Sequence, residues 1–246
     1  MKLIKLTTPL LLIFFYLAFS YVRFYHTIGD VNLKSPYADK TLALENAAQK
    51  GSVKYVALGD SLSAGVGSAD IKETIVYLHA LKLSEKYEKV NVLNLARSGD
   101  TTTEVIRNQL PQAIEEKPDH TTLLIGINDI HNKRTLADFR NNYQLILNEL
   151  LTRTSAKITV INIPYLGSRK TAYFPFNYLL NFRTTQFNKI ISSLVAEINS
   201  SDRIRLVDLY GQTLAISKQS SAYYAADLFH PSAEGYLIWG EIINAR

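Results

Sequence analysis

The chain has 246 residues, 47% of them hydrophobic, a length that suits one α/β domain with a large core and is too short for two catalytic domains. Its formal net charge is +5, but the Lys and Arg residues are scattered rather than gathered into a stripe, so we expect no nucleic-acid partner. Because Cys is absent, disulfides, thiolate nucleophiles and Cys-ligated zinc are excluded.

The N-terminus has the layout of an export signal. Lys2 and Lys5 precede an apolar run at residues 10–22, and the small residues within 18–20 offer a site for a signal peptidase. The run is short for a membrane-spanning helix, which needs about 20 apolar residues, so cleavage and retention both stay open. We therefore predict that residues 1–22 are a signal peptide or an uncleaved membrane anchor. The protein is expected to be exported, and either held in the cell envelope or secreted.

The segment at residues 23–51 lacks strong periodicity. It contains Gly29, Pro36 and several charges, which indicates a tether that can carry a short helix over residues 38–49. The globular domain is then expected to cover residues 52–246.

Short apolar runs alternate with amphipathic helical patterns along this domain. The runs, which predict strands, lie at residues 53–58, 90–95, 121–125, 158–163 and 204–207. The clearest helical pattern places Phe139, Tyr143, Ile146, Leu147 and Leu150 on one face. This alternation predicts a parallel sheet covered by helices on both faces, with a site beyond the carboxyl ends of its strands.

Polar motifs follow these strands where such a site would form. Ser61, in the tetrapeptide Gly-Asp-Ser-Leu, follows the first strand, and Gly99 follows the second. Asn128, in Gly-Ile-Asn-Asp, follows the third. Asp227 and His230 belong to the loop before a final helical pattern. The topology therefore brings all five residues to one edge of the sheet.

These residue types are those that acyl transfer requires. A serine hydroxyl is a poor nucleophile at neutral pH, so an imidazole must take its proton as it attacks a carbonyl. We assign Ser61 as nucleophile and His230 as base. Asp227 lies three residues before His230, a spacing that lets its carboxylate accept from the imidazole Nδ1–H and fix the tautomer.

Three donors are available for the negative charge that builds on the substrate oxygen. They are the backbone N–H groups of Ser61 and Gly99 and the side-chain amide of Asn128, and such donors contribute about 3–4 kcal/mol each. Gly at position 99 permits unusual dihedrals and a close approach of the backbone. A neutral amide at position 128 donates to the oxyanion, whereas a carboxylate there would repel it.

In order and spacing, the four motif blocks resemble those of the SGNH/GDSL hydrolase family over residues 52–246. The resemblance implies a three-layer αβα sandwich with a five-stranded parallel, flavodoxin-like sheet. It also implies the same roles for the five residues, and cleavage of carboxylic esters through an acyl-enzyme. No cofactor and no metal are expected.

Other site types match the chain less well. A phosphate-binding loop would need Lys where Val66 stands, and the Gly-x-Ser-x-Gly elbow of the α/β-hydrolases is absent. Four aspartates, Asp60, Asp100, Asp129 and Asp227, lack the His-rich partners of a metal cluster. We expect the Asp60 side chain to cap the turn that presents the serine.

Three further histidines are expected to lie outside the chemistry. His79, on a helical pattern, and His120, at the start of the third strand, are predicted to be structural. His131 is predicted to be a solvated loop residue or to line the rim of the site.

An aromatic segment at residues 165–182 follows the fourth strand. It forms either an apolar wall that receives an acyl chain or a loop that completes the core. The substrate is accordingly an ester of a small molecule, a lipid or an O-acylated envelope glycan, and the N-terminal segment can contact a membrane. The alternative from another functional class is a catalytically silent binding module for acylated polysaccharide, which would be expected to show a damaged triad.

Overall fold

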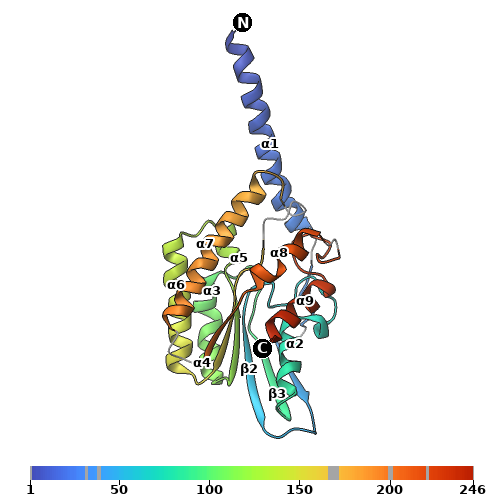
Figure 1. Cartoon of the computed structure of the whole chain (residues 1–246), viewed down its shortest axis with the longest axis vertical. Helices are drawn as coiled ribbons and strands as arrows, with labels where there is room; N and C mark the ends of the chain where they lie inside the picture. Colours follow the sequence, from blue (N-terminus) through green and yellow to red (C-terminus); the bar gives the residue numbers. More distant parts are fainter. Residues whose placement is uncertain are drawn as a thin grey trace.

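A central β-sheet with helices on both faces forms the body of the protein (Figure 1). The computed structural model describes residues 2–30, 33–37, 40–165, 172–198, 202–219 and 222–245. One long N-terminal helix projects from the end of this body.

The sheet has six strands in the order β1-β3-β2-β4-β5-β6. They are β1 (Thr41–Glu45), β2 (Ser52–Gly59), β3 (Lys89–Asn94), β4 (His120–Leu124), β5 (Lys157–Ile161) and β6 (Ile204–Val207). Every neighbouring pair is parallel except β1 and β3, which run antiparallel. The five parallel strands follow the flavodoxin-like order, so the predicted three-layer αβα fold is confirmed, with one strand added at an edge.

Helices cover the two faces of the sheet. One layer contains α2 (Ile75–Ser84), α8 (Leu209–Gln219) and α9 (Ala233–Asn244). The other contains α3 (Thr102–Glu104), a π-helical turn η2 (Val105–Gln109), α4 (Leu110–Glu116), α6 (Leu136–Arg153) and α7 (Phe176–Glu197). The short elements η1 (Ile71–Glu73) and α5 (Ile127–His131) lie in connections that follow β2 and β4. The predicted amphipathic face at residues 139–150 is the buried face of α6.

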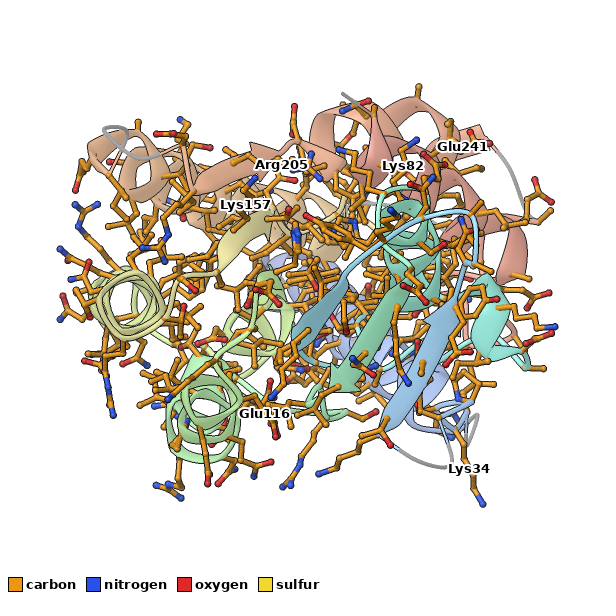
Figure 2. All side chains as sticks on the ribbon, turned by 90° about the horizontal axis from the view of Figure 1, so that it is seen from below. Lys34, Lys82, Glu116, Lys157, Arg205 and Glu241 are labelled. Atoms are coloured by element: carbon orange, nitrogen blue, oxygen red, sulfur yellow. The ribbon has the colours of Figure 1, made fainter. Side chains whose placement is uncertain are left out.

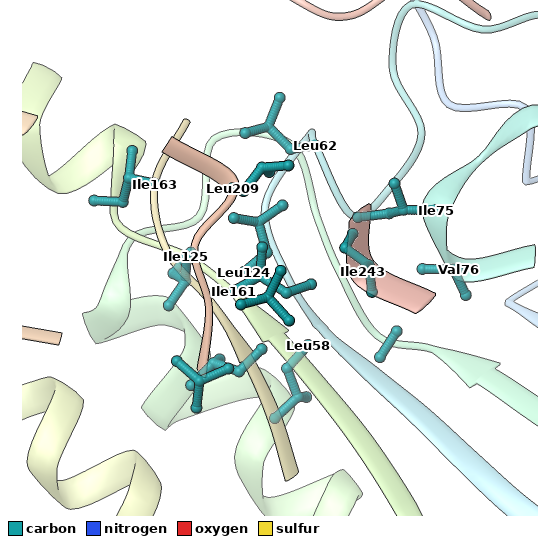
Figure 3. Close-up of a cluster of buried hydrophobic side chains, with 14 of the residues drawn as sticks. Leu58, Leu62, Ile75, Val76, Leu124, Ile125, Ile161, Ile163, Leu209 and Ile243 are labelled. Atoms are coloured by element: carbon teal, nitrogen blue, oxygen red, sulfur yellow. The ribbon is translucent and has the colours of Figure 1, made fainter. Parts of the chain in front are cut away.

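The core is built on the apolar runs that predicted the strands. Leu58, Leu124 and Ile161 come from three neighbouring strands, are almost completely buried, and lie together with Leu62 and Leu209 (Figure 3). Burying a side chain of this size contributes about 1.5–3 kcal/mol, so this cluster holds the strand ends firmly in place. The loops that follow the carboxyl ends of the strands therefore begin at well-held positions.

The N-terminal helix α1 (Lys2–Asp30) is longer than predicted. It continues eight residues past position 22 into the segment that was expected to be a tether. The side chains at residues 10–17 are exposed, whereas Ser20 and Phe24 are buried against the globular domain. These contacts explain why the helix does not stop at the end of the apolar run. Among the described residues, α1 alone is long and apolar enough to cross a membrane, with a mean hydropathy of 1.3 over Pro9–His26.

Strand β1 corrects the expectation of a short helix over residues 38–49. Residues 41–45 are a strand that pairs with β3, and residues 38–39 lie outside the described part of the chain. The sequence Thr-Leu-Ala-Leu-Glu alternates with a period of two, so Leu42 and Leu44 both face the core. The sheet consequently begins before residue 52.

Candidate active site

Ser61 lies in a tight loop at the carboxyl end of β2. The Leu62 N–H donates to Asp60 Oδ1 over 3.0 Å, and the Ala64 N–H donates to the Asp60 carbonyl over 2.9 Å. The expected cap by the Asp60 side chain is thus confirmed. It fixes the turn that presents the serine hydroxyl.

Asp227 organises the loop that carries His230. Its Oδ1 accepts the backbone N–H groups of Phe229 and His230, each at 3.0 Å. Leu228, between Asp227 and Phe229, has a left-handed backbone with φ of 55°. The second carboxylate oxygen, Oδ2, accepts from His230 Nδ1 at 2.5 Å. One carboxylate therefore holds both the backbone and the ring of the histidine.

The loops of Ser61 and His230 pack directly on one another. Gly67, with φ of 105°, lies so close that a Cβ there would stand 2.2 Å from the carbonyl oxygen of Pro231 and 3.1 Å from the His230 Cβ. The Tyr236 hydroxyl, from α9, also donates to the Val66 carbonyl at 2.8 Å. Only a residue without a side chain permits this approach.

Ser61, His230 and Asp227 form a continuous chain of hydrogen bonds. Ser61 Oγ lies 2.8 Å from His230 Nε2, although the two residues are 169 positions apart. Because the Asp227 carboxylate can only accept, the imidazole carries its proton on Nδ1 and leaves Nε2 free to accept from the serine hydroxyl. This is the tautomer that a general base requires.

Asp227, the carboxylate in this series of hydrogen bonds, stays ionised. Burial raises the pKa of Asp227, but the hydrogen bond from His230 and the two backbone donors outweigh it, so the net pKa lies below the usual value. The carboxylate therefore acts only as an acceptor for the Nδ1–H of the His230 ring.

The loops with the three predicted donors are joined by hydrogen bonds at the same edge. Asn128 Nδ2 donates to the Asp100 carbonyl at 2.9 Å, and Gln109 donates to Asp100 Oδ2 at 2.7 Å. Gln109 also pairs with both backbone groups of Gly59, at 3.0 and 2.8 Å. Since Gly99 precedes Asp100 in the chain, these bonds link it to Asn128 and to the loop of Ser61.

The candidate donors keep hydrogen-bonding capacity. Among the described residues, no partner engages the backbone N–H of Ser61 or of Gly99, and the Asn128 amide uses one of its two hydrogens. Gly99 has φ of 86°, and a Cβ there would meet no atom within 4 Å. The protein itself thus leaves room at position 99, and the left-handed backbone is what favours glycine there.

Two polar residues that support this edge were not predicted from the sequence. Gln109 ends a π-helical turn, a kind of irregularity that often lies at functional sites. Asp129 is buried and accepts from the N–H and the hydroxyl of Thr102, at 3.0 and 2.6 Å, which fixes α5 against α3. Gln109 stands among other polar residues, Arg107 and Asn108, so the local sequence does not mark it.

Asp60 has one carboxylate oxygen, Oδ2, without a hydrogen-bond partner in the structure. Burial, together with the nearby charges of Asp129 and Asp100, outweighs the Leu62 hydrogen bond and raises the pKa of Asp60 to about 8. Asp60 is therefore largely protonated at neutral pH. No group of three or more His, Cys, Asp or Glu side chains in the described ranges could hold a metal ion.

The other predicted histidines lie as follows. His79 is buried in α2, where its Nδ1 donates to Asn244 Oδ1 at 2.8 Å, and His120 starts β4. The buried hydrogen bond gives His79 the predicted structural role, and His120 stands at the amino end of its strand, as predicted. His131 is not a solvated loop residue, because its Nε2 is buried and its ring lies 5.4 Å from the rings of both Phe24 and Phe229. Burial beside His230 lowers the pKa of His131 to about 4.

The aromatic segment at residues 165–182 divides into two faces where the structure describes it, which excludes 166–171. Phe176 packs on Phe24 of α1, with ring centroids 5.1 Å apart. Phe174 and Phe182, by contrast, are exposed. In the described part, Ala172 and Leu180 belong to the core, as one reading of the segment expected, whereas Phe174 and Phe182 face outward.

Comparisons with known proteins agree with this geometry. The profile of the GDSL-like Lipase/Acylhydrolase family matches residues 57–238. The spore germination lipase LipC of Bacillus licheniformis is 24% identical over 221 residues, which cover 78% of this chain and 95% of that protein. The crystal structure of the lipase/acylhydrolase from Enterococcus faecalis has a TM-score of 0.63 and 27% identity, covering 78% of this chain and 93% of that one. Axe2, an acetylxylan esterase from Geobacillus stearothermophilus, shares the fold, with a TM-score of 0.61, 18% identity and coverage of 79% and 93%.

Proposed function

Since this chain belongs to the GDSL-like lipase/acylhydrolase family, it is a carboxylic ester hydrolase, and we propose that it works through an acyl-enzyme formed on Ser61. The observation that carries the proposal is the hydrogen-bonded chain from Ser61 Oγ through the His230 ring to Asp227. A serine, a base in the right tautomer and an ionised acid are the parts that nucleophilic ester cleavage needs.

In the first step, Ser61 Oγ attacks the ester carbonyl carbon while its proton passes to His230 Nε2. The carbonyl oxygen becomes negative and accepts hydrogen bonds from the backbone N–H groups of Ser61 and Gly99 and from the Asn128 amide. The imidazolium, stabilised by Asp227, then gives its proton to the leaving alcohol as the carbon–oxygen bond breaks. An acyl group remains on the serine.

In the second step, a water molecule attacks this acyl group. His230 takes one water proton, the tetrahedral intermediate collapses, and the proton returns to Ser61 Oγ as the carboxylic acid leaves. The cycle needs no cofactor, because the residues present supply both the nucleophile and the proton transfers.

We propose that residues 52–246, extended by strand β1, form the catalytic domain and that residues 1–22 direct the protein out of the cytoplasm. The apolar helix near the N-terminus is compatible with a signal or an anchor. A location in the cell envelope suits esters of lipids and O-acylated glycans equally. A silent binding module is disfavoured, since Ser61, Asp227 and His230 are all in place.

The test is turnover of a panel of 4-nitrophenyl esters, from acetyl to long chains, by the wild type, Ser61→Ala and Ser192→Ala. Ser192 is exposed on α7 and serves as a matched control. We expect Ser61→Ala to lose turnover at every chain length and Ser192→Ala to keep it. A fluorophosphonate should add its mass to the wild type and to Ser192→Ala only. Equal turnover by Ser61→Ala would remove the proposed nucleophile.

A further inference from the structure

An exposed apolar patch lies at the start of α7, beside the base of α1. We call it the α7 patch: Phe174, Tyr178, Leu179 and Phe182, each more than half exposed. Phe174 precedes α7, and the spacing of Tyr178, Leu179 and Phe182 puts them on one side of the helix. The buried Leu180 and Thr184 lie on the other side. Such a cluster of large apolar side chains on a protein surface marks a site of contact with another apolar surface.

The nearest apolar surface is that of α1. This helix begins at Lys2, and the part that precedes Ser20, which contacts the domain, is about 27 Å long at about 1.5 Å per residue, close to the thickness of a hydrocarbon layer of about 30 Å. Figure 1 shows α1 leaving the molecule at the end where α7 begins. The α7 patch therefore lies at the end of the molecule from which α1 projects.

Contacts fix the level at which a membrane around α1 must end. Phe24 and Tyr21 both pack on Phe176, with ring centroids 5.1 and 5.5 Å apart. The Ser20 hydroxyl donates to the Tyr173 carbonyl at 3.4 Å. Because these turns of α1 touch the domain, the boundary of the bilayer falls at the α7 patch rather than farther along a free linker.

Residue types at this level are those that prefer a membrane–water interface. Tyr21, Tyr173 and Tyr178 surround the junction, as in the aromatic belts of membrane proteins. The Arg23 guanidinium lies 4.0 Å from the centroid of the Tyr173 ring. Lys133 is exposed and lies 5.8 Å from the centroid of the Tyr21 ring, where it can meet anionic headgroups.

The opposite end of the molecule has a different surface. Figure 2, seen from that end, shows charged side chains of both signs pointing outward, among them Lys82, Glu116, Lys157 and Glu241. A surface with charges of both signs is typical of a solvent-exposed end. The contrast between the ends gives the domain one orientation relative to a bilayer.

The active site is connected to the membrane-facing end. A series of rings in contact runs from Phe24 of α1 to His131, then to Phe229 and to His230, with centroid separations of 5.4, 5.4 and 5.0 Å. The base of the triad is therefore three ring contacts from the helix.

We propose that α1 stays attached as a membrane anchor, that the α7 patch enters the same bilayer, and that the active site takes its esters from membrane lipids. The substrate class rests on the proposed ester hydrolysis, whereas the membrane contact does not. The substrate class and the membrane contact can therefore be tested in separate experiments.

Because the chain contains no Cys, single cysteines can be labelled cleanly. We would place an environment-sensitive fluorophore at Leu179→Cys and, as a matched control, at Leu81→Cys, an exposed leucine on α2 beside Lys82. The full chain is reconstituted into vesicles of phosphatidylglycerol and phosphatidylcholine with nitroxide-labelled acyl chains. The Leu179 probe should lose most of its emission and the Leu81 probe little. Equal quenching at the two positions, or none at Leu179 and at a second probe on Phe174→Cys, would overturn the membrane contact.

The substrate class is tested with Leu179→Glu and Phe182→Glu, with Leu81→Glu as control. Hydrolysis of water-soluble 4-nitrophenyl acetate should be unchanged in all three. Hydrolysis of a phospholipid in vesicles should fall about tenfold or more in the first two only, since each loses the burial of a large apolar side chain. Cleavage of O-acetylated polysaccharide but not of phospholipid would overturn the lipid assignment. If the wild type does not hydrolyse 4-nitrophenyl acetate at all, the proposed function is refuted. The quenching result would still support the membrane contact.

Discussion

His131→Phe should make the protein more resistant to acid. The His131 ring lies among Phe24, Tyr25 and Phe229, and its buried Nε2 has no hydrogen-bond partner among the residues that the structure describes. Its pKa of about 4 lies below the value of 6.5 for the unfolded chain, because burial disfavours the charged ring and His230 adds repulsion.

The direction in which pH changes the stability follows from proton uptake by the folded and unfolded states. Above pH 6.5 the ring is neutral in both states. Between pH 6.5 and about 4 the unfolded chain binds a proton that the folded protein does not, so stability falls with falling pH. From pH 6.5 to 4.5 the loss is about 2–3 kcal/mol, at 1.36 kcal/mol per pH unit. A phenyl ring of similar size takes up no proton and leaves no polar atom unpaired.

The assay is urea unfolding of the full chain in mild detergent at pH 7 and pH 4.5, followed by the fluorescence of the buried Trp239, the chain's only tryptophan. The wild type should lose about 2–3 kcal/mol more than His131→Phe between the two pH values. His79, whose pKa burial also lowers to about 4, is present in both proteins and cancels. Parallel pH dependence of the two proteins would refute the reasoning, and would indicate that Phe24 does not cover the ring.

Three further substitutions test the site. Asn128→Ala should lower kcat by about a hundred- to a thousandfold with little change in KM, measured on 4-nitrophenyl acetate, because it removes a donor to the oxyanion. Gln109→Leu should destabilise the fold by about 3 kcal/mol or more in urea unfolding, since it leaves both buried backbone groups of Gly59 unpaired; a change below about 1 kcal/mol would contradict this. Gly67→Ala should lower both kcat and the thermal midpoint, as its Cβ would collide with the Pro231 carbonyl; an unchanged kcat would show that the two loops can separate without cost.

Much of the fold follows from local patterns in the sequence. The apolar runs predict all five parallel strands to within two residues, because strands buried on both faces need continuous apolar residues. Strand β1 was missed because a half-buried edge strand of five residues carries a weak alternating signal. The continuation of α1 past residue 22 depends on Phe24 and Ser20 packing against the domain, a tertiary contact that local periodicity does not contain.

The residues of the site likewise fall into those that local sequence predicts and those that it does not. Residues that must be of one chemical type, such as Ser61 and His230, stand in recognisable motifs. The supporting contacts of Gln109 join residues 50 positions apart, so nothing local marks its role. The burial of His131 likewise depends on Phe24, more than a hundred residues earlier in the chain.

The separation of 169 positions between Ser61 and His230 has a consequence for the timing of synthesis. A ribosome that has delivered the nucleophile must still add most of the chain before the base exists, and α9 must then dock through Tyr236 on the loop after the serine. On the proposed mechanism, a nascent or partly translated chain is therefore unable to cleave esters. Hydrolysis then starts only after the last helix has docked and folding is complete.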